Sequence, residues 1–223
     1  LRRWITEQHF DIYGIPETDL YWPKIQQKLQ LQERVREWWK TDTTHTVCAY
    51  NQNQRCTSNT QWGGTAQISR GQAAFRVMAS GQDPTRLGRW VWTQYRGKGN
   101  RRLRVITAYR PCQKTTSSPF ATWTQQRTHF QSKKQDREPR KAILDDLAGE
   151  IHRWAADGEH VVLMMDCNED VRSNTITTFL NNCGLRDIVL ERHGNEAPRT
   201  HKRGSHPIDA IFATPSVQCV RAG

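Results

Sequence analysis

Polar and charged residues directly follow a strongly apolar run in the segment VVLMMDCNED, residues 161–170. The apolar run predicts a buried strand, and Asp166 and Asn168 come where that strand ends. A carboxylate and an amide at a strand end could hold a metal ion, orient a water molecule or contact a phosphate. The alternative is a turn or helix-capping role, which is more usual for a lone aspartate after an apolar strand.

Three further candidates occupy predicted strands. Glu17 ends the stretch DIYGIPE, Tyr109 ends RRLRVITAY, and Asp209 lies between apolar residues in PIDAIFAT. Ligands of layered α/β folds bind where strands end and loops begin, so these side chains are candidates for one site. Asp209 would be costly to bury without a cation, a hydrogen-bonding partner or a metal. The alternative for Asp209 is an edge strand on which it faces water.

The chemistry open to these residues is that of a phosphoesterase. Glu17 and Asp166 offer hard oxygen ligands, and Mg²⁺ takes one or two carboxylates together with substrate phosphates. A metal-bound phosphate, an activated water and a stabilised leaving oxygen together allow hydrolysis of a phosphate ester. Asn168 could orient the nucleophile and Tyr109 could hydrogen-bond a phosphate. Arg110, directly after Tyr109, is the basic residue best placed to meet a substrate phosphate.

Periodicity and turn signals indicate the elements that must position these residues. Pro23 and Pro139 suit the first turns of two helices, and Gly158 and Gly184 suit helix ends. Residues 111–136 are polar and poorly periodic, which predicts a long loop. The order of elements favours a mixed α/β layered fold, with an α+β fold of separate halves as the alternative. The predicted strands are 9–17, 44–50, 63–69, 73–80, 88–95, 101–109, 160–166 and 207–214, and the predicted helices are 22–40, 139–157 and 173–183.

Composition and charge limit the class of protein. The chain has 223 residues, enough for one large domain, and its 33 Lys and Arg against 22 Asp and Glu give a formal charge of +11. This excess favours a polyanionic partner, either nucleic acid or an anionic membrane surface, with simple solubility as the alternative. No apolar run approaches the length of a membrane span. The 6 cysteines lack C-x-x-C spacing, so we expect free thiols, with disulfides as the alternative. Free thiols are typical of intracellular proteins, so we expect an intracellular location, of which the nucleus is one.

Four stretches together resemble the endonuclease/exonuclease/phosphatase superfamily. DIYGIPET, RVITAYRP, LMMDCNED and HPIDAIFAT occur in the order and at the approximate spacing of that family's motifs, which look like D-I-x-x-x-Q-E-T, Y-x-P, G-D-x-N and S-R-I-D-Y-I. Four ordered motifs are far more specific than one, and the resemblance covers nearly the whole chain. The family includes deoxyribonuclease-like enzymes, apurinic/apyrimidinic endonucleases and the endonuclease domains of retroelements.

The resemblance implies a fold, a cofactor and a role for each candidate. The fold would be an α/β four-layer sandwich of two mixed β-sheets flanked by helices, and the cofactor would be Mg²⁺ or Mn²⁺. Glu17 would be the metal ligand, and Tyr109 would contact the scissile phosphate. Asp166 would orient or deprotonate the attacking water, and Asn168 would assist phosphate binding. Asp209 would pair with a catalytic histidine.

The chain also departs from the family pattern. Pro16 stands where the family usually has Gln, and Met165 and Cys167 flank Asp166 where Gly and a hydrophobic residue are common. His206 and the proline after it stand where a basic residue often precedes Ile-Asp. These substitutions weaken the resemblance at three of its four motifs.

The resemblance places two further motifs outside residues 1–223. A strand carrying an Asn should precede Leu1, and a Ser-Asp-His motif with the catalytic histidine should follow Gly223. We therefore expect residues 1–223 to be a single domain truncated at both ends, and expect this fragment alone to be impaired in turnover. His201 and His206 fall in the wrong motif context and are interpreted as loop histidines.

Three functions fit these observations. The first is a metal-dependent endonuclease that acts on nucleic acid, with DNA as the expected partner and a mobile element as the expected source. The second is a phosphoesterase for lipid or small phosphate esters, which predicts an apolar or compact pocket beside Asp166. The third is an inactive relic that binds nucleic acid or a partner. Two basic clusters, 96–104 and 133–141, suit phosphate-backbone contacts, with solvated loops as the alternative.

Overall fold

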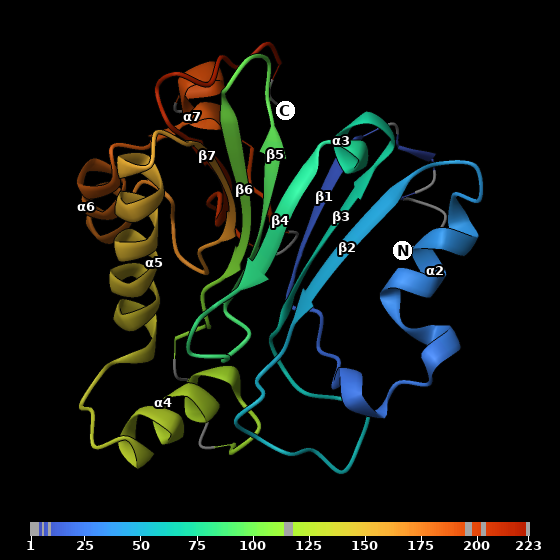
Figure 1. Cartoon of the computed structure of the whole chain (residues 1–223). Helices are drawn as coiled ribbons and strands as arrows, with labels where there is room; N and C mark the ends of the chain where they lie inside the picture. Colours follow the sequence, from blue (N-terminus) through green and yellow to red (C-terminus); the bar gives the residue numbers. More distant parts are fainter. Residues whose placement is uncertain are drawn as a thin grey trace.

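Two β-sheets pack face to face between outer helices. The computed structural model describes residues 5, 7, 8, 10–113, 118–194, 198–201 and 204–221 of the chain. Helix α2 (Leu31–Trp38) lies outside the smaller sheet, and α5 (Pro139–Ala156) and α6 (Asn174–Cys183) lie outside the larger one (Figure 1). The order helix, sheet, sheet, helix confirms the predicted four-layer α/β sandwich.

The smaller sheet has three strands in the order β1-β3-β2. It is antiparallel rather than mixed, because β1 and β2 both run antiparallel to the central β3. Tyr13 and Ile68 of this sheet pack against Val35 of α2 and the adjacent Trp39. The strands are β1 (Ile12–Pro16), β2 (Thr44–Ala49) and β3 (Thr65–Arg70).

The larger sheet has six strands and is mixed. Strands β6 and β7 are parallel neighbours, and the other pairs are antiparallel. Its fully buried Trp90, Leu163 and Phe212 belong to one core cluster with the apolar faces of α5 and α6. In the order in which they lie, the strands are β4 (Val77–Gln82), β5 (Trp90–Arg96), β6 (Arg102–Tyr109), β7 (His160–Asp166), β9 (Asp209–Ala213) and β8 (Arg186–Asp187).

The two sheets approach closely at Gly14 of β1. A Cβ atom at this position would lie 2.8 Å from Met164 Cε and 2.8 Å from Thr107 Oγ1. Any side chain here would push β1 away from the larger sheet, so glycine allows the close packing. The end of β1 therefore lies near the ends of β6 and β7.

The outer helices begin and end where local signals predict. Glu138 caps α5 by accepting a hydrogen bond from the Lys141 N–H, and Pro139 occupies the first helical position. Ser173 caps α6 in the same way. Gly184 ends α6 in the left-handed conformation, with φ of +62°. The predictions of these two helices are confirmed, because the residues that cap each helix lie within a few positions of its ends and can be read from the sequence.

The helix predicted over 22–40 is wrong over its first half. Two short 3₁₀ turns, Trp22–Lys24 and Gln27–Leu29, precede α2. Gln26 and Gln30 interrupt the helical path with ψ of 143° and 144°. The Gln30 side-chain amide donates hydrogen bonds to two backbone carbonyls of the first turn. Such side-chain bonds compete with helical backbone bonds and stabilise the broken path.

The segment 111–136 is wrongly predicted as a loop throughout, because α4 (Thr122–Ser132) forms within it. The buried face of α4 includes Gln125 and Gln126 beside Phe130. Amides on the buried face remove the hydrophobic periodicity by which a helix is recognised. Helix α4 lies across the end of the sandwich at the bottom of Figure 1.

The predicted strands 63–69 and 73–80 do not pair with each other, because the chain crosses from one sheet to the other between them. The short helix α3 (Gly71–Phe75) separates β3, in the smaller sheet, from β4, in the larger one. The predicted strand 207–214 begins only at Asp209, which is therefore the first residue of β9 rather than an interior one. Helix α7 (Ile188–His193) and the short strand β8 are additional to the predicted elements.

All six cysteines are free thiols. No helix in the described ranges combines the length and the apolar character needed to cross a bilayer. The described part of the fold is therefore held together by packing, hydrogen bonds and ion pairs.

A buried ion pair joins the larger sheet to α5. Arg89 and Asp83 are both fully buried, and Arg89 Nε donates to Asp83 Oδ2 at 2.7 Å. The same guanidinium lies 2.8 Å from a carboxylate oxygen of Asp146, on α5. Burial opposes ionisation of Asp83, but the hydrogen bonds and charge of Arg89 outweigh it and lower the pKa of Asp83.

Replacing Asp83 with Asn is expected to lower the free energy of unfolding by about 3 kcal/mol, because a buried guanidinium loses its main counter-charge. Urea denaturation followed by tryptophan fluorescence measures this. The matched control is Asp42→Asn, which breaks a partly exposed pair with Arg70 and should cost less than about 1 kcal/mol. Equal losses in the two variants would contradict the argument.

Candidate active site

Three of the predicted site residues lie side by side at one end of the larger sheet. Strands β6, β7 and β9 are neighbours, and their registers pair Tyr109 with Asp166 and Asp166 with Asp209. Tyr109 and Asp166 end their strands, and Asp209 begins its own, so all three meet at the same edge. The pairing itself places one phenol and two carboxylates in a row.

Glu17 joins this row from the smaller sheet. It directly follows β1, and its Oε1 accepts a hydrogen bond of 2.6 Å from the Tyr109 hydroxyl. The backbone of Glu17 has a φ of +52°, which is uncommon for a residue other than glycine. Burial and the bond to Glu17 raise the pKa of Tyr109, so its hydroxyl stays a donor.

The electrostatics of the site centre on Asp166. Burial raises the pKa of its carboxyl, and the negative charges of Asp209 and Glu17 raise it further, to about 7. A hydrogen bond of 3.0 Å from the Asn168 N–H to Asp166 Oδ1 partly offsets these effects. A carboxyl group with this pKa can both accept and release a proton near neutral pH.

Asn168 is fixed at the turn that follows β7. Its φ is +46°, a left-handed conformation that asparagine tolerates better than most residues. Its Nδ2 donates to the Arg110 carbonyl at 2.8 Å, and its Oδ1 accepts from the Cys112 thiol at 3.1 Å. The amide therefore links the loop after β6 to the loop after β7.

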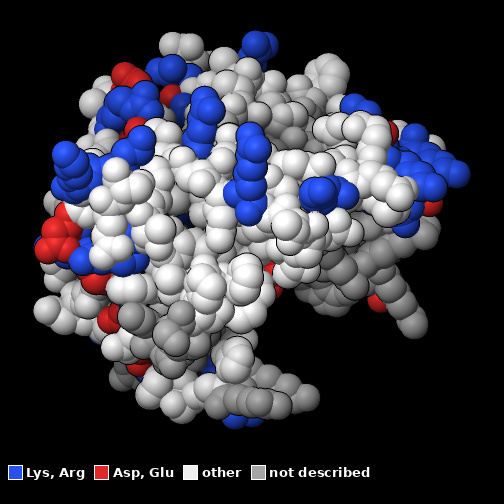
Figure 2. Space-filling model, turned by 90° about the horizontal axis from the view of Figure 1, so that it is seen from below, with Lys and Arg blue, Asp and Glu red and all other residues white. Residues whose placement is uncertain are grey.

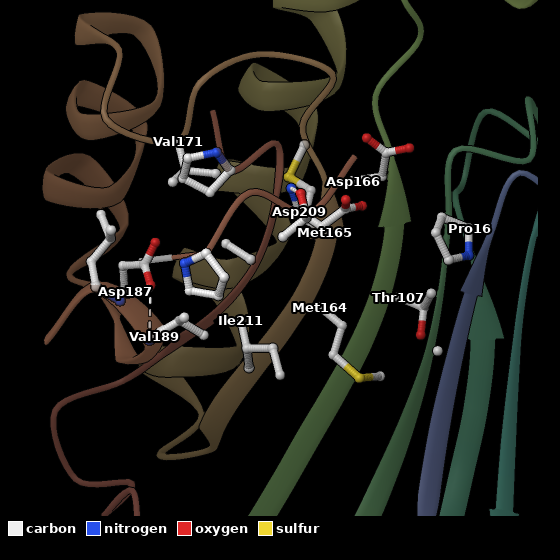
Figure 3. A pocket seen from close by; sticks show the side chains of 16 residues that line it. Pro16, Thr107, Met164, Met165, Asp166, Val171, Asp187, Val189, Asp209 and Ile211 are labelled. Carbon is white, nitrogen blue, oxygen red and sulfur yellow. Dashed lines mark hydrogen bonds between the residues drawn. The ribbon is translucent and has the colours of Figure 1, made fainter. Parts of the chain in front are cut away.

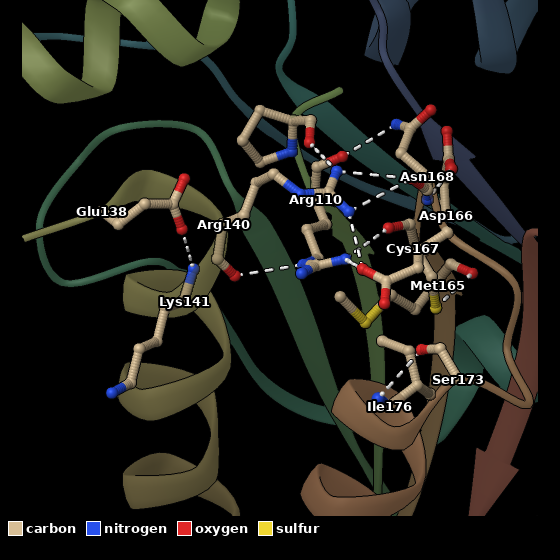
Figure 4. A network of polar contacts seen from close by, with 12 residues as sticks. Arg110, Glu138, Arg140, Lys141, Met165, Asp166, Cys167, Asn168, Ser173 and Ile176 are labelled. Carbon is tan, nitrogen blue, oxygen red and sulfur yellow. Dashed lines mark hydrogen bonds and ion pairs between the residues drawn. The ribbon is translucent and has the colours of Figure 1, made fainter. Parts of the chain in front are cut away.

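Arg110 is turned toward protein groups (Figure 4). It is 3 % exposed, and its Nη1 donates to Glu169 Oε2 at 2.6 Å and to the Cys167 carbonyl at 3.1 Å. Its Nε donates to the Arg140 carbonyl at 3.0 Å. These bonds hold the loop that carries Asn168. Contact of Arg110 with a substrate phosphate stays a prediction.

Sequence reasoning missed the role of Arg140, which it grouped with a basic cluster. Arg140 Nη2 donates to Glu169 Oε2 at 2.8 Å, and Nη1 donates to the Pro111 carbonyl at 2.7 Å. Burial opposes ionisation of Glu169, but Arg110 and Arg140 help to lower its pKa to about 2. The positive charge of Arg140 also lowers the pKa of Asp166, against the larger effect of burial. The only sequence signal for this role was that Arg140 is the second residue of a helix that begins with a proline.

Asp19 and Cys112 are two further residues that the sequence motifs do not single out. The Asp19 Oδ1 accepts from the Gly63 N–H at 2.8 Å, and burial raises the pKa of Asp19. Cys112 is exposed and lies against the Asn168 amide. Both follow a motif residue by two or three positions, which is the only sequence signal they carry.

The two histidines near Asp209 in sequence lie in loops, as interpreted. His206 Nδ1 lies 3.3 Å from Asp170 Oδ2 and 3.1 Å from Arg172 Nη2. Its carboxylate partner is therefore Asp170 and not Asp209. His201 is exposed in the segment that precedes β9.

One cavity borders Asp166 and another borders Asn168. A pocket of about 310 Å³ borders Asp166 and Asp209 and is otherwise lined mainly by apolar side chains such as Met164 and Ile211 (Figure 3). A groove of about 990 Å³ borders Asn168 and continues between α5 and α6. The groove carries three cationic and three anionic side chains, so its charges balance: Arg110, Arg140, Lys141, Glu138, Asp145 and Glu169.

The two basic clusters behave differently. Residues 96–104 lie on the β5–β6 hairpin, at the opposite end of β6 from Tyr109, and Arg104 is buried in a pair with Glu159. Of the cluster 133–141, Arg140 lies in the site, whereas Lys133, Lys134 and Lys141 are exposed. Seen from the end of the sandwich at which α4 lies, Lys and Arg side chains are spread over the surface, and Asp and Glu are fewer (Figure 2).

The donor set fits a magnesium ion. The described residues contain no group of three or more His, Cys, Asp or Glu side chains arranged to hold a metal by themselves. Mg²⁺ is commonly held by one or two carboxylates, and water and substrate phosphates complete its shell. Glu17 and Asp166 provide such carboxylates. Burial is the main cause of the raised pKa of Asp166, and the negative charges of Asp209 and Glu17, which a cation would offset, add to it.

Comparison with known proteins supports the fold. No family model and no curated protein matches the sequence. Among solved structures, an AP endonuclease from Archaeoglobus fulgidus matches with a TM-score of 0.61 and 16% identity, covering 96% of this chain and 80% of that one. The 3' phosphatase NExo from Neisseria, bound to a product DNA hairpin, matches with a TM-score of 0.57 and 17% identity, covering 96% and 80%.

An endonuclease/exonuclease/phosphatase protein from Bacteroides vulgatus matches with a TM-score of 0.56 and 15% identity, covering 96% of this chain and 77% of that one. At these identities the likeness concerns the fold. The chain has the endonuclease/exonuclease/phosphatase fold, as its four motifs predict.

Proposed function

We propose that this protein is a metal-dependent phosphodiesterase that hydrolyses nucleic acid. The observation that carries the proposal is the meeting of Glu17, Asp166 and Asp209, which lie at the ends of three strands, at one end of the sandwich. Carboxylates that repel one another are typical of sites where a cation or a proton transfer needs them. The solved structures with this fold include an AP endonuclease and a phosphatase bound to DNA, which supports the same class of reaction.

The proposed mechanism assigns a task to each side chain. Asp166, with a pKa of about 7, accepts the proton of the attacking water, and Asp209 favours that transfer by its negative charge. The Tyr109 hydroxyl, which donates to Glu17 here, is the donor available to a phosphate oxygen. Glu17 would hold Mg²⁺ or Mn²⁺, and water and substrate phosphate would complete the shell of the ion. A bound ion would polarise the phosphate and stabilise charge on the leaving oxygen.

Nucleic acid is the proposed substrate because of charge. The formal charge of +11 favours binding of a polyanion, and the exposed Lys141 of α5 lines the groove beside Asn168. The groove beside Asn168 extends well beyond the size of one phosphate, so it could follow a longer substrate. DNA is the proposed nucleic acid, since the solved neighbours include DNA-processing enzymes.

A second candidate is hydrolysis of a phosphate ester with an apolar group. The pocket beside Asp166 and Asp209 favours it, because most of its lining is apolar and its volume of about 310 Å³ suits a small group. In this case the apolar part of the substrate would contact Met164 and Ile211. The two candidates share the same carboxylates and differ in the cavity that the substrate occupies.

Nicking of supercoiled plasmid tests the proposed function. We expect nicking in Mg²⁺ or Mn²⁺ that EDTA abolishes and that excess metal restores. The assay uses residues 1–223 and the chain extended at both ends, since the resemblance places two motifs there. The control variant Asp136→Asn changes a 91%-exposed carboxylate and should nick normally. Hydrolysis of small or lipid phosphate esters without nicking would overturn the nucleic-acid proposal in favour of the second candidate.

A further inference from the structure

Two large aromatic side chains lie in water at the end of the sandwich that carries the site. Trp62 is 47% exposed and Phe120 is 63% exposed. The residue after Trp62 is bonded to Asp19, because the Gly63 N–H donates to the Asp19 carboxylate and the Gly63 carbonyl accepts from the Asp19 N–H. The neighbour of Trp62 in the chain is therefore bonded to the residue two positions after Glu17. Phe120 precedes α4, which lies at the same end (Figure 1).

One buried amide positions both aromatic residues. Gln125 is 6% exposed, and its Nε2 donates to the Phe120 carbonyl at 2.7 Å and to the Trp62 carbonyl at 3.2 Å. Its Oε1 accepts from the buried Asn51 side chain at 3.1 Å. Burying a polar network is costly unless every member is satisfied. Here the network brings together the backbones of two residues that are far apart in the sequence and whose side chains are exposed.

Both rings stay largely exposed although buried hydrogen bonds fix the backbone that carries them. A flat apolar ring that is exposed to water near a phosphate site is suited to stacking on a nucleobase. Bases in a duplex are already stacked on one another, so their faces are closed to a protein ring. Only an unpaired base offers its face.

We infer that Trp62 and Phe120 form a stacking site for the bases of an unpaired strand next to the scissile phosphate. This rests on the proposed function and adds the substrate class: single-stranded nucleic acid, or a duplex with an unpaired stretch. The chemistry recognised is the base face, which DNA and RNA share. The rings supply binding energy through stacking, and the carboxylates of the site act on the phosphate alone.

The test measures binding rather than cleavage, in EDTA, by fluorescence anisotropy of labelled oligonucleotides. Trp62→Ala and Phe120→Ala should each weaken binding of oligothymidine by about tenfold, and Trp62→Phe should retain it within about twofold. An abasic oligonucleotide should bind all variants equally. The control is Phe75→Ala, which removes a 78%-exposed ring at the end of α3, and it should leave binding unchanged. Circular dichroism verifies that each variant is folded.

The other arms separate the alternatives. Equal weakening for a fully paired duplex and for oligothymidine would overturn the stacking site, as would unchanged binding in both alanine variants. Vesicle binding that Trp62→Ala abolishes, without any effect on oligonucleotides, would overturn it in favour of a membrane contact. An oligoribonucleotide arm decides between DNA and RNA. Because no cleavage is needed, failure of the plasmid assay and failure of this one are distinct results.

Discussion

Replacement of Asp166 with Asn is expected to reduce nicking by about a thousandfold, because the variant loses the group that accepts a proton from the attacking water. Asparagine keeps the size of the side chain, and its Oδ1 can still accept the hydrogen bond from the Asn168 N–H. The loss would therefore reflect chemistry rather than misfolding. Initial rates in Mg²⁺ measure it, in whichever form of the protein nicks. Nicking unaffected by the substitution would show that the activity comes from another site or from a contaminant.

The same variant is expected to be more stable than the wild type above pH 7 when metal is removed. Folding raises the pKa of Asp166 from 3.8 to about 7, so the folded state binds more protons than the unfolded state between these values. Stability therefore falls as pH rises through this interval, and the full cost is present above pH 7. Asp166→Asn removes the cost, which we set at about 2 kcal/mol after allowing for partial solvent exposure.

Urea denaturation in EDTA at several pH values checks this second effect. The difference in the free energy of unfolding between Asp166→Asn and wild type should be small near pH 4 and should grow up to about pH 7. A difference that does not vary with pH would contradict the raised pKa. Together the two measurements would show that stability is lowered at the position where the reaction needs a charged group.

Replacement of Glu17 with Gln is the second large effect that we expect. The amide can still accept the hydrogen bond from the Tyr109 hydroxyl, but it lacks the negative charge that a hard cation needs. Affinity for Mn²⁺ should fall by at least about tenfold, and nicking at fixed Mg²⁺ should fall by about a hundredfold. A higher Mg²⁺ concentration should recover part of the rate, which distinguishes loss of metal binding from loss of a proton acceptor.

Calorimetric titration with Mn²⁺ measures the affinity directly. The matched control is Glu37→Gln, which changes an exposed carboxylate on α2, outside the smaller sheet. It should bind Mn²⁺ and nick like the wild type. Unchanged Mn²⁺ affinity in Glu17→Gln would assign the metal to other carboxylates and leave Glu17 with a structural role through Tyr109.

Elements with strong local signals could be predicted from the sequence. Helix α5 begins at Pro139 and has a continuous apolar face, and β7 is an apolar run, so neither depends on distant contacts to be recognised. Helix α4 could not be predicted in this way. Its buried face includes Gln125, whose amide finds hydrogen-bonding partners only once Asn51 and the loop of Trp62 are in place.

The candidate site also has a part that the sequence predicts and a part that only the fold decides. The residue types at strand ends are visible in the sequence, so Asp166, Tyr109 and Asp209 could be proposed for one site. The sequence leaves open which way Arg110 turns. In the structure its guanidinium forms an ion pair with Glu169. The same carboxylate also pairs with Arg140, which comes from a different segment of the chain.

By itself, the sequence determined most of the longer strands and the helices α5 and α6, the basic character of the protein, and the polar residues at the ends of its central strands. Those properties follow from composition and from patterns a few residues long. Only the tertiary structure decided that Glu17 meets Tyr109, 92 residues away, and that one amide of Gln125 binds the backbone carbonyls of both Trp62 and Phe120. Such meetings depend on how closely two sheets pack at Gly14 and on a buried amide network, and neither is encoded in local periodicity.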